Sequence, residues 1–156
     1  MLQQDEKWMK LALELAHAAA ARDEVPVGAV LVRNDQILAK TFNLKEHLGS
    51  ALGHAECLAI HRASVRAGGW RLGEGTTLYV TLEPCLMCAG AIQQARISRV
   101  VFGASDPKGG AVRSLYQALE DSRLNHRCEV VGGVLGDECG SVLTEFFRGK
   151  RDQRRR

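Results

Sequence analysis

The segment Pro84-Cys85-Leu86-Met87-Cys88 carries two cysteines separated by two residues, directly after a predicted strand and at the start of a predicted helix. This spacing on a first helical turn lets both sulfur atoms reach one metal ion. The partly positive N-terminus of a helix also lowers thiol pKa values and favours the thiolates that bind metals. Taken alone, the pair is equally typical of a redox couple or of half of a structural zinc site.

A second segment, His54-Ala55-Glu56, lies at the start of another predicted helix. One histidine and two cysteines form a soft set of three ligands that suits tetrahedral Zn²⁺ and leaves a fourth position open for water. Residues two apart do not share a helix face, so Glu56 is not well placed to bind the same ion as His54. We expect its carboxylate to reach the water instead, an arrangement that favours catalysis.

Alternating strands and helices must hold these two segments together. The spacing of Trp8, Leu11, Ala12, Leu15, Ala16 and Ala19 predicts an amphipathic helix that ends before Pro26. Strands are predicted at 27–32, 37–42, 77–82, 99–102 and 129–131, the first two joined by a turn at Asn34-Asp35. Further helices are predicted at about 54–66, after Pro84, at about 114–120, and in the last segment, where Cys139, Val142, Leu143 and Phe146 share a face. This order predicts a three-layer α/β/α domain with a five-stranded mixed sheet.

The composition is that of a globular protein. The 156 residues are 46% hydrophobic and 25% charged, which excludes disorder, and the length predicts a single domain with its own core. No apolar run approaches the roughly 18 residues of a membrane span, and the N-terminus lacks the pattern of a secretory signal. We therefore expect a cytoplasmic protein, in which five cysteines do not form a disulfide framework.

Positive charge is concentrated at the C-terminus. Residues 148–156 hold six cations and one anion, although the net charge of the whole chain is only +3. We expect residues 1–149 to form the domain and residues 150–156 to form a basic tail. Such a tail is typical of nucleic-acid binding, but it is also typical of a solvated terminus.

The combined pattern His-x-Glu and Pro-Cys-x-x-Cys is the signature of zinc-dependent nucleobase deaminases. Surrounding segments resemble the bacterial tRNA-specific adenosine deaminases over almost the whole range 8–148. These segments are 24–30, 77–85, 88–91, 99–104, 125–127 and 146–148. The resemblance implies a cytidine deaminase-like fold and a homodimer. It also implies conversion of the wobble adenosine in the anticodon loop of an arginine tRNA to inosine.

The resemblance also implies the catalytic roles. His54, Cys85 and Cys88 would bind one zinc ion per chain, which lowers the pKa of its water from about 15.7 toward about 7 for attack on adenine C6. Glu56 would take a proton from this water, pass it to N1 and assist the departure of ammonia. We expect burial to raise the pKa of Glu56, because the group must act as both base and acid.

Contacts to the substrate follow from the same resemblance. Asn43 would contact the target nucleoside, and the small residues Val27, Gly28 and Ala29 would form the floor of the pocket. Flanking nucleotides would be bound by Asp106, Lys108, Asn125, Phe147 and Arg148. Phe146 lies on the predicted core stripe, so Phe147 is the better surface for base stacking. One departure from the family is Ser50-Ala51-Leu52-Gly53, which replaces the usual Asp-Pro-Thr-Ala before the histidine.

Three other functions compete with this hypothesis. A free-base or nucleoside deaminase acting on cytosine, cytidine or guanine would have the same metal ligands, but it would not need a basic C-terminus. A catalytically silent, zinc-stabilised RNA-binding subunit would not need Glu56. A redox protein built on the cysteine pair would leave both His54 and Glu56 without a role.

Overall fold

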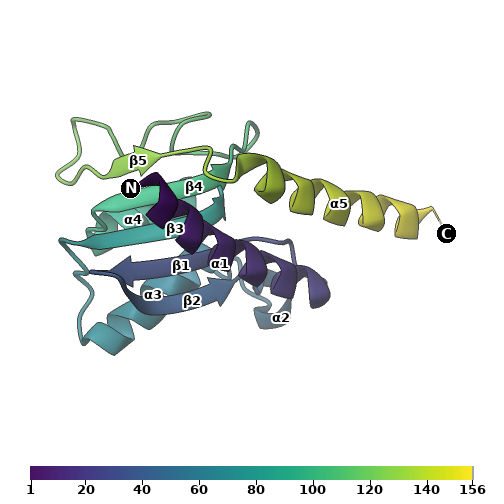
Figure 1. Cartoon of the computed structure of the whole chain (residues 1–156), viewed down its shortest axis with the longest axis horizontal. Helices are drawn as coiled ribbons and strands as arrows, with labels where there is room; N and C mark the ends of the chain where they lie inside the picture. Colours follow the sequence, from purple (N-terminus) through teal and green to yellow (C-terminus); the bar gives the residue numbers. More distant parts are fainter. Residues whose placement is uncertain (156) are drawn as a thin grey trace.

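A mixed sheet organises residues 1–155, the part of the chain that the computed structural model describes (Figure 1). Its strand order is β2-β1-β3-β4-β5. β1 pairs antiparallel with both β2 and β3, whereas the β3–β4 and β4–β5 pairs are parallel. The strands are β1 Gly28–Arg33, β2 Gln36–Phe42, β3 Thr76–Leu82, β4 Arg99–Ala104 and β5 Glu129–Val131. The predicted five-stranded mixed sheet is confirmed.

Helices cover both faces of this sheet (Figure 1). They are α1 Leu2–Ala21, α2 Lys45–Leu48, α3 Ala55–Ala67, α4 Leu86–Ala95 and α5 Gly136–Arg154. Val30 of β1 packs with α1 residues in one buried cluster, while its neighbour Leu31 packs with α3 and α4 residues in another. Successive side chains of a strand point to opposite faces, so this alternation produces the predicted three-layer α/β/α arrangement.

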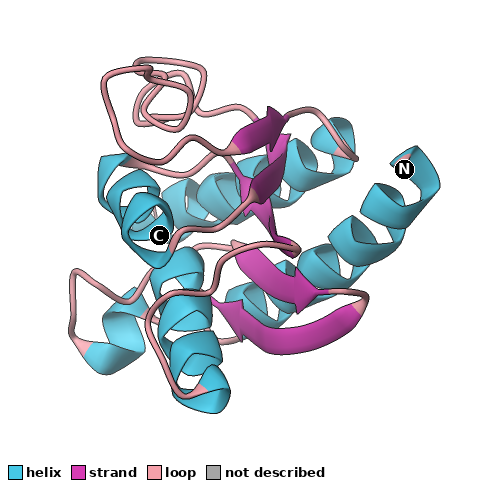
Figure 2. Cartoon of the chain, turned by 90° about the vertical axis from the view of Figure 1, so that its left-hand side faces the viewer, coloured by secondary structure: helices cyan, strands magenta, loops and turns pink. Residues whose placement is uncertain are grey.

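The helix predicted at 114–120 is wrong. Residues 105–128, which connect β4 to β5, form turns and irregular backbone that appear as a long loop in Figure 2. The backbone N–H groups of Val112, Arg113 and Ser114 donate to the Glu83 carboxylate. Leu119 is fully buried within the loop, and its carbonyl accepts a hydrogen bond from Cys128. These long-range contacts replace the local hydrogen bonds that a helix would need.

The basic C-terminal segment continues the last helix. α5 extends through Lys150 and Arg151 to Arg154, while position 156 lies outside the described residues. The side chain of Lys150 forms an ion pair with Asp23, just after α1. Within residues 1–155, no helix combines the length and apolar character needed to cross a membrane.

A buried charged network fixes the start of α1 to the sheet. Arg99 on β4 donates two hydrogen bonds of 2.7 Å to the Asp5 carboxylate, and the Tyr79 hydroxyl donates a third of 2.9 Å. Burial alone would raise the pKa of Asp5, but the hydrogen bonds from Arg99 and Tyr79 outweigh it and lower the pKa. The network sets how α1 lies across β3 and β4.

Candidate active site

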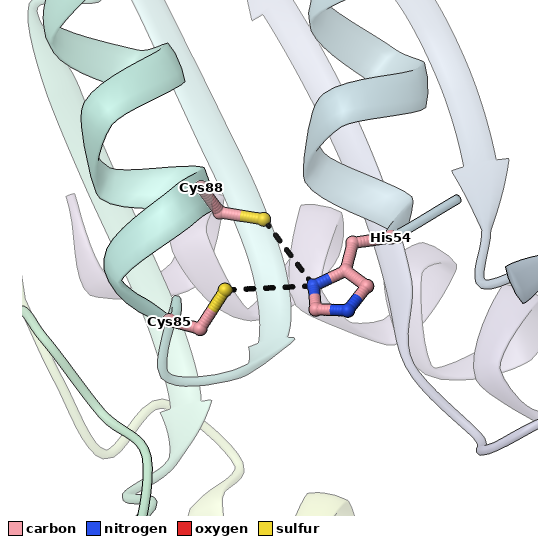
Figure 3. Close-up of side chains that lie close together, drawn as sticks. All are labelled: His54, Cys85 and Cys88. Carbon is pink, nitrogen blue, oxygen red and sulfur yellow. Dashed lines mark hydrogen bonds between the residues drawn. The ribbon is translucent and has the colours of Figure 1, made fainter. Parts of the chain in front are cut away.

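The N-termini of two helices bring the predicted metal ligands together. His54 immediately precedes α3, Cys85 immediately precedes α4, and Cys88 lies in the first turn of α4. His54 Nδ1 lies 3.5 Å from the sulfur of Cys85 and 3.5 Å from that of Cys88 (Figure 3). Residues 31 and 34 positions apart in the sequence therefore converge on one point, because parallel β3 and β4 hold α4 beside α3.

These distances fit a tetrahedral zinc site. Zinc bonds of about 2.3 Å to sulfur and about 2.0 Å to nitrogen, at the tetrahedral angle, separate the two donor atoms by about 3.5 Å. One donor atom from each of His54, Cys85 and Cys88 lies within 4.8 Å of the others. One imidazole and two sulfurs are also the ligand types that zinc prefers, and three ligands leave a fourth position open.

The electrostatics at Cys85 also favour a cation, whereas hydrogen bonds with Cys57 and Cys85 raise the pKa of Cys88. A hydrogen bond from Cys88 lowers the pKa of Cys85 to about 3, and the hydrogen bond with His54 acts in the same direction. Cys85 is therefore a thiolate at neutral pH. A thiolate is the form of cysteine that binds metal ions.

Glu56 follows His54 into the first turn of α3 and is only 4% exposed. Burial raises its pKa to about 7, in the direction expected from the sequence. A carboxyl group with this pKa exchanges protons readily at neutral pH, in either direction. The site therefore combines a cation-binding set with a proton-transfer group.

A pocket of about 180 Å³ opens onto this cluster. Its lining combines apolar side chains with polar and charged groups that come from separate segments of the chain. The lining residues are Val25, Val27, Asn43, Lys45, His54, Ala55, Glu56, Leu82, Glu83, Cys85 and Asp106. An enclosed apolar surface with a few convergent polar groups is typical of a small-molecule or base-binding site.

Asn43 lies in this pocket, as the resemblance to the deaminases led us to expect. Its side-chain amide donates to the carbonyl of Val25 at 3.3 Å, and its side-chain carbonyl accepts from the Lys45 N–H at 3.1 Å. Each polar end of an asparagine amide can form a second hydrogen bond. Asn43 is thus held in place and retains the capacity to bind a ligand.

The three expected floor residues separate on the two faces of the sheet. Val27 lines the pocket. A Cβ at Gly28 would lie 2.0 Å from the Ala12 carbonyl oxygen, so this glycine permits the close approach of α1 on the opposite face. Ala29 is fully buried in the core beside α3. In the described chain, neither Gly28 nor Ala29 contributes to the pocket lining.

Asp106 lines the pocket, whereas the other expected RNA contacts lie outside its lining in residues 1–155. Lys108 and Asn125 are exposed on the loop between β4 and β5. Phe147 is 45% exposed and faces a wide hollow of about 820 Å³ between α1, α2 and α5. Arg148 faces a different hollow, beside Asp137 at the start of α5.

The hollow that contains Phe147 adjoins the pocket, because Val25 lines both. Its other walls are mainly cationic and aromatic, with two carboxylates, and Asp23 is paired with Lys150. The cationic and aromatic residues are Arg22, His47, Phe146, Phe147, Lys150, Arg151 and Arg154. Exposed aromatic rings beside cations are typical of surfaces that bind single-stranded nucleic acid.

Sequence reasoning missed two buried carboxylates at the edges of the pocket. Glu24, 1% exposed, accepts hydrogen bonds from the N–H groups of Glu46 and His47 and contacts the His47 ring. Glu83, 2% exposed, holds the loop after β4. The sequence signal was the position of each acid, since Glu24 precedes the Val25-Pro26 segment and Glu83 precedes Pro84.

The segment 50–53, where the sequence departs from the deaminases it resembles, packs against α2. A Cβ at Gly53 would lie 2.8 Å from the Cα of Lys45, so glycine permits this approach. The Gly53 carbonyl accepts a hydrogen bond from the Leu44 N–H at 2.9 Å. The segment therefore closes the loop that carries Asn43 and Lys45.

Residues 3–151 match the family model of the MafB19-like deaminases. The tRNA-specific adenosine deaminase of Bacillus subtilis (strain 168) is 51% identical over 152 residues, covering 97% of this chain and 94% of the relative. Similarity therefore extends over the whole fold and is not confined to the metal-binding motif.

Solved structures have the same architecture. One, from a study of A-to-I editing by tRNA:A34 deaminases at the wobble position of transfer RNA, has a TM-score of 0.84 and 44% identity. The match covers 88% of this chain and 99% of that chain. The guanine deaminase of Nitrosomonas europaea has a TM-score of 0.77 at 23% identity, over 90% of this chain and 83% of that chain. At this identity the second match establishes the fold alone.

Proposed function

The chain belongs to the MafB19-like deaminases and to the family of bacterial tRNA-specific adenosine deaminases, and from this membership we propose that it deaminates adenosine to inosine at the wobble position of a tRNA. The arginine tRNA is the proposed substrate. The observation that carries the proposal is the placement of buried Glu56 in one pocket with His54 and Cys85. This is the arrangement that hydrolytic deamination of a base requires.

We propose one Zn²⁺ per chain, bound by His54 Nδ1, Cys85 and Cys88. When bound, zinc lowers the pKa of a water from about 15.7 toward about 7 and so supplies the nucleophile for adenine C6. The 3.5 Å separations between His54 Nδ1 and each sulfur support this assignment.

Glu56 transfers the protons of the reaction. Its carboxylate accepts a proton from the attacking water and delivers it to N1 of the base. It then takes the proton of the hydroxyl group formed at C6 and passes it to the amino group, so that the C6–N bond breaks and ammonia leaves. The raised pKa of about 7 supports both roles, because the group is partly protonated at neutral pH. Burial also excludes bulk water, which would otherwise exchange these protons.

Val27 and Asn43 orient the target base. Val27 provides an apolar surface for a flat ring, and Asn43 provides a fixed amide at the pocket wall. Because the pocket holds about 180 Å³, flanking nucleotides must lie outside it. The target base therefore has to be extruded from the anticodon loop.

RNA contacts extend from the pocket across the rim and α5. Asp106 lies at the pocket, while Lys108, Asn125, Phe147 and Arg148 are proposed to contact the flanking nucleotides and phosphates. The basic last turns of α5 line the hollow that adjoins the pocket at Val25, which supports a path for the RNA along it. A homodimer, with RNA contacted by both subunits, is part of the same proposal.

Incubation with an unmodified anticodon stem-loop of an arginine tRNA tests the proposal. We expect inosine to form at the wobble position, and free adenosine, cytosine and guanine to remain unchanged under the same conditions. Turnover of a free base without reaction of the stem-loop would identify a free-base deaminase. Stem-loop binding without inosine formation would identify a silent RNA-binding subunit.

A further inference from the structure

The carboxylate of Glu83 is buried at the end of β3 and receives five hydrogen bonds from one loop. Four donors are backbone N–H groups, and the fifth is a hydroxyl group on a neighbouring side chain. They are the N–H groups of Asp106 at 3.0 Å, Val112 at 3.2 Å, Arg113 at 2.8 Å and Ser114 at 2.8 Å, and the Ser114 hydroxyl. An anion at this position thus organises the backbone of residues 105–114.

The loop is closed tightly over this carboxylate. A Cβ at Gly110 would lie 2.3 Å from the carboxyl carbon of Glu83, so glycine at this position lets the chain pass directly against the carboxylate. The Ala111 N–H donates to the Pro84 carbonyl at 2.9 Å. Glu83 and Pro84 together therefore support the loop from the same short segment that carries the metal ligand Cys85.

This support places Asp106 at the pocket. Its N–H is held by Glu83, and its own side-chain oxygen accepts the N–H groups of Lys108 and Gly109 at 3.1 Å each. Asp106 lines the pocket together with Glu56 and Asn43. The carboxylate of Glu83 thereby fixes one wall of the pocket relative to the metal ligands.

We propose that Glu83 is a positioning residue for RNA binding, which acts through Asp106 and the loop 105–114 without touching the reacting atoms. The inference rests on the proposed function, because the loop is assigned to bind the flanking nucleotides. Loss of the anion should loosen the loop and weaken substrate binding. It should leave zinc binding and the chemical step nearly unchanged, because His54 and Glu56 stand at the start of α3, Cys88 lies in α4, and Cys85 is tied to α4 by the hydrogen bond from the Ala89 N–H to its carbonyl.

Glu83→Gln is the direct test, in the zinc-loaded full chain with the arginine anticodon stem-loop as substrate. The variant keeps the shape of the side chain, but its amide donor faces the N–H donors of the loop. We expect KM to rise by at least about tenfold, the effect of losing a hydrogen bond to a charged group. We expect kcat to change by less than about threefold, with zinc still at one ion per chain.

Asp5→Asn is the matched control for a loss of stability. It also converts a buried carboxylate to an amide, but Asp5 is hydrogen-bonded by Arg99 and Tyr79, away from the pocket lining. We expect it to lower the melting temperature and leave KM unchanged. A raised KM in Glu83→Gln but not in Asp5→Asn separates positioning from general destabilisation.

A double-mutant cycle tests whether Glu83 acts through Asp106. If it does, the increase in KM of the double variant Glu83→Gln/Asp106→Ala is smaller than the product of the increases in the two single variants, because both changes disrupt the same interaction. Ser114→Ala, which removes one of the five hydrogen bonds, is the milder variant should Glu83→Gln not fold. Its expected KM increase is about threefold.

Three outcomes would overturn the inference. One is an unchanged KM in both Glu83→Gln and Ser114→Ala. Another is a KM increase in Glu83→Gln/Asp106→Ala that equals the product of the two single increases. These two leave the proposed function intact, because the wild type still deaminates the stem-loop. A wild-type chain that neither binds nor deaminates the stem-loop refutes the proposed function, and this inference with it.

Discussion

His54 Nδ1 lies 3.5 Å from the sulfur of Cys88, although the two residues begin different helices and are 34 positions apart. This separation is the one that tetrahedral zinc imposes between a nitrogen and a sulfur ligand. The sheet thus sets the distance between these side chains, because α3 and α4 lie side by side on the same face (Figure 3).

We expect the purified chain to contain one zinc per molecule, and Cys88→Ser to lower zinc affinity by more than about tenfold, since one of three ligands is weakened. Inductively coupled plasma mass spectrometry and chelator competition measure the two quantities. Cys139→Ser is the control, because Cys139 is buried against β4 on α5, outside the ligand cluster. Equal zinc affinities in the wild type and Cys88→Ser would refute the ligand assignment.

Glu56→Gln should retain zinc and lose turnover by about 10²- to 10⁴-fold, because a buried amide cannot carry the protons of the reaction. Inosine formation from the stem-loop at saturating concentration measures kcat. Zinc content and circular dichroism of the same sample serve as the controls for folding. Turnover close to that of the wild type would rule out Glu56 as the proton-transfer group.

Removal of the residues after Arg148 should weaken RNA binding and reduce its salt dependence. The slope of log K against log salt concentration should change by about 0.7 for each single-strand phosphate that the shortened chain no longer neutralises. Arg123→Ala is the control, because Arg123 pairs with Asp121 in a turn away from the hollow beside α5. An unchanged slope after truncation would assign these residues to solvent.

Arg99→Ala should destabilise the fold by about 3 to 5 kcal/mol, because it leaves the buried Asp5 carboxylate without its cationic partner. Denaturant unfolding, followed by circular dichroism, measures the free energy of unfolding. The double variant Asp5→Ala/Arg99→Ala should lose less than the sum of the two single losses, since neither charge is then left unpaired. A double variant whose loss of unfolding free energy equals the sum of the two single losses would contradict this account.

Acid should weaken the fold through Asp5. Its pKa is lowered from the ordinary value of 3.8, so in the range just below 3.8 the unfolded chain binds the proton that the folded chain rejects. The corresponding stability is complete above about pH 5 and is lost as the pH falls through the folded pKa. Urea unfolding of the wild type and Asp5→Asn between about pH 2 and about pH 6 tests this. We expect the free energy of unfolding to fall less steeply with decreasing pH in the variant than in the wild type. Equal slopes would exclude Asp5 as the titrating group.

Local spacing in the sequence was sufficient to predict which side chains gather at the candidate site. Cys85 and Cys88 occupy one helical turn wherever that helix lies, and Glu56 follows His54 in the same way. The strands and four of the five described helices also follow from apolar periodicity, because burial of one face is a local pattern. The exception is the short α2, which is four residues long and has no buried side chain to produce such a pattern.

Contacts between distant segments overrode local preference elsewhere. Residues 114–120 have the periodicity of a helix, yet the N–H groups of Val112, Arg113 and Ser114 donate to Glu83, about 30 positions earlier. Gly28 was expected beneath a base, but the strand alternation places it against α1. Neither result can be predicted from the spacing of residues along the chain, because each depends on which distant segment packs against these residues.

The residue types gathered at the candidate site follow from the order of residues along the chain. One imidazole, two sulfurs and a carboxylate stand at two helix starts, and each is fixed by its immediate neighbours. The shape of the pocket around them depends instead on how the chain folds. The fold brings Glu24 to the N–H groups of α2 and Glu83 to those of the loop 105–114. Both segments are remote in the sequence, and each buried charge requires the hydrogen-bond donors that its segment supplies.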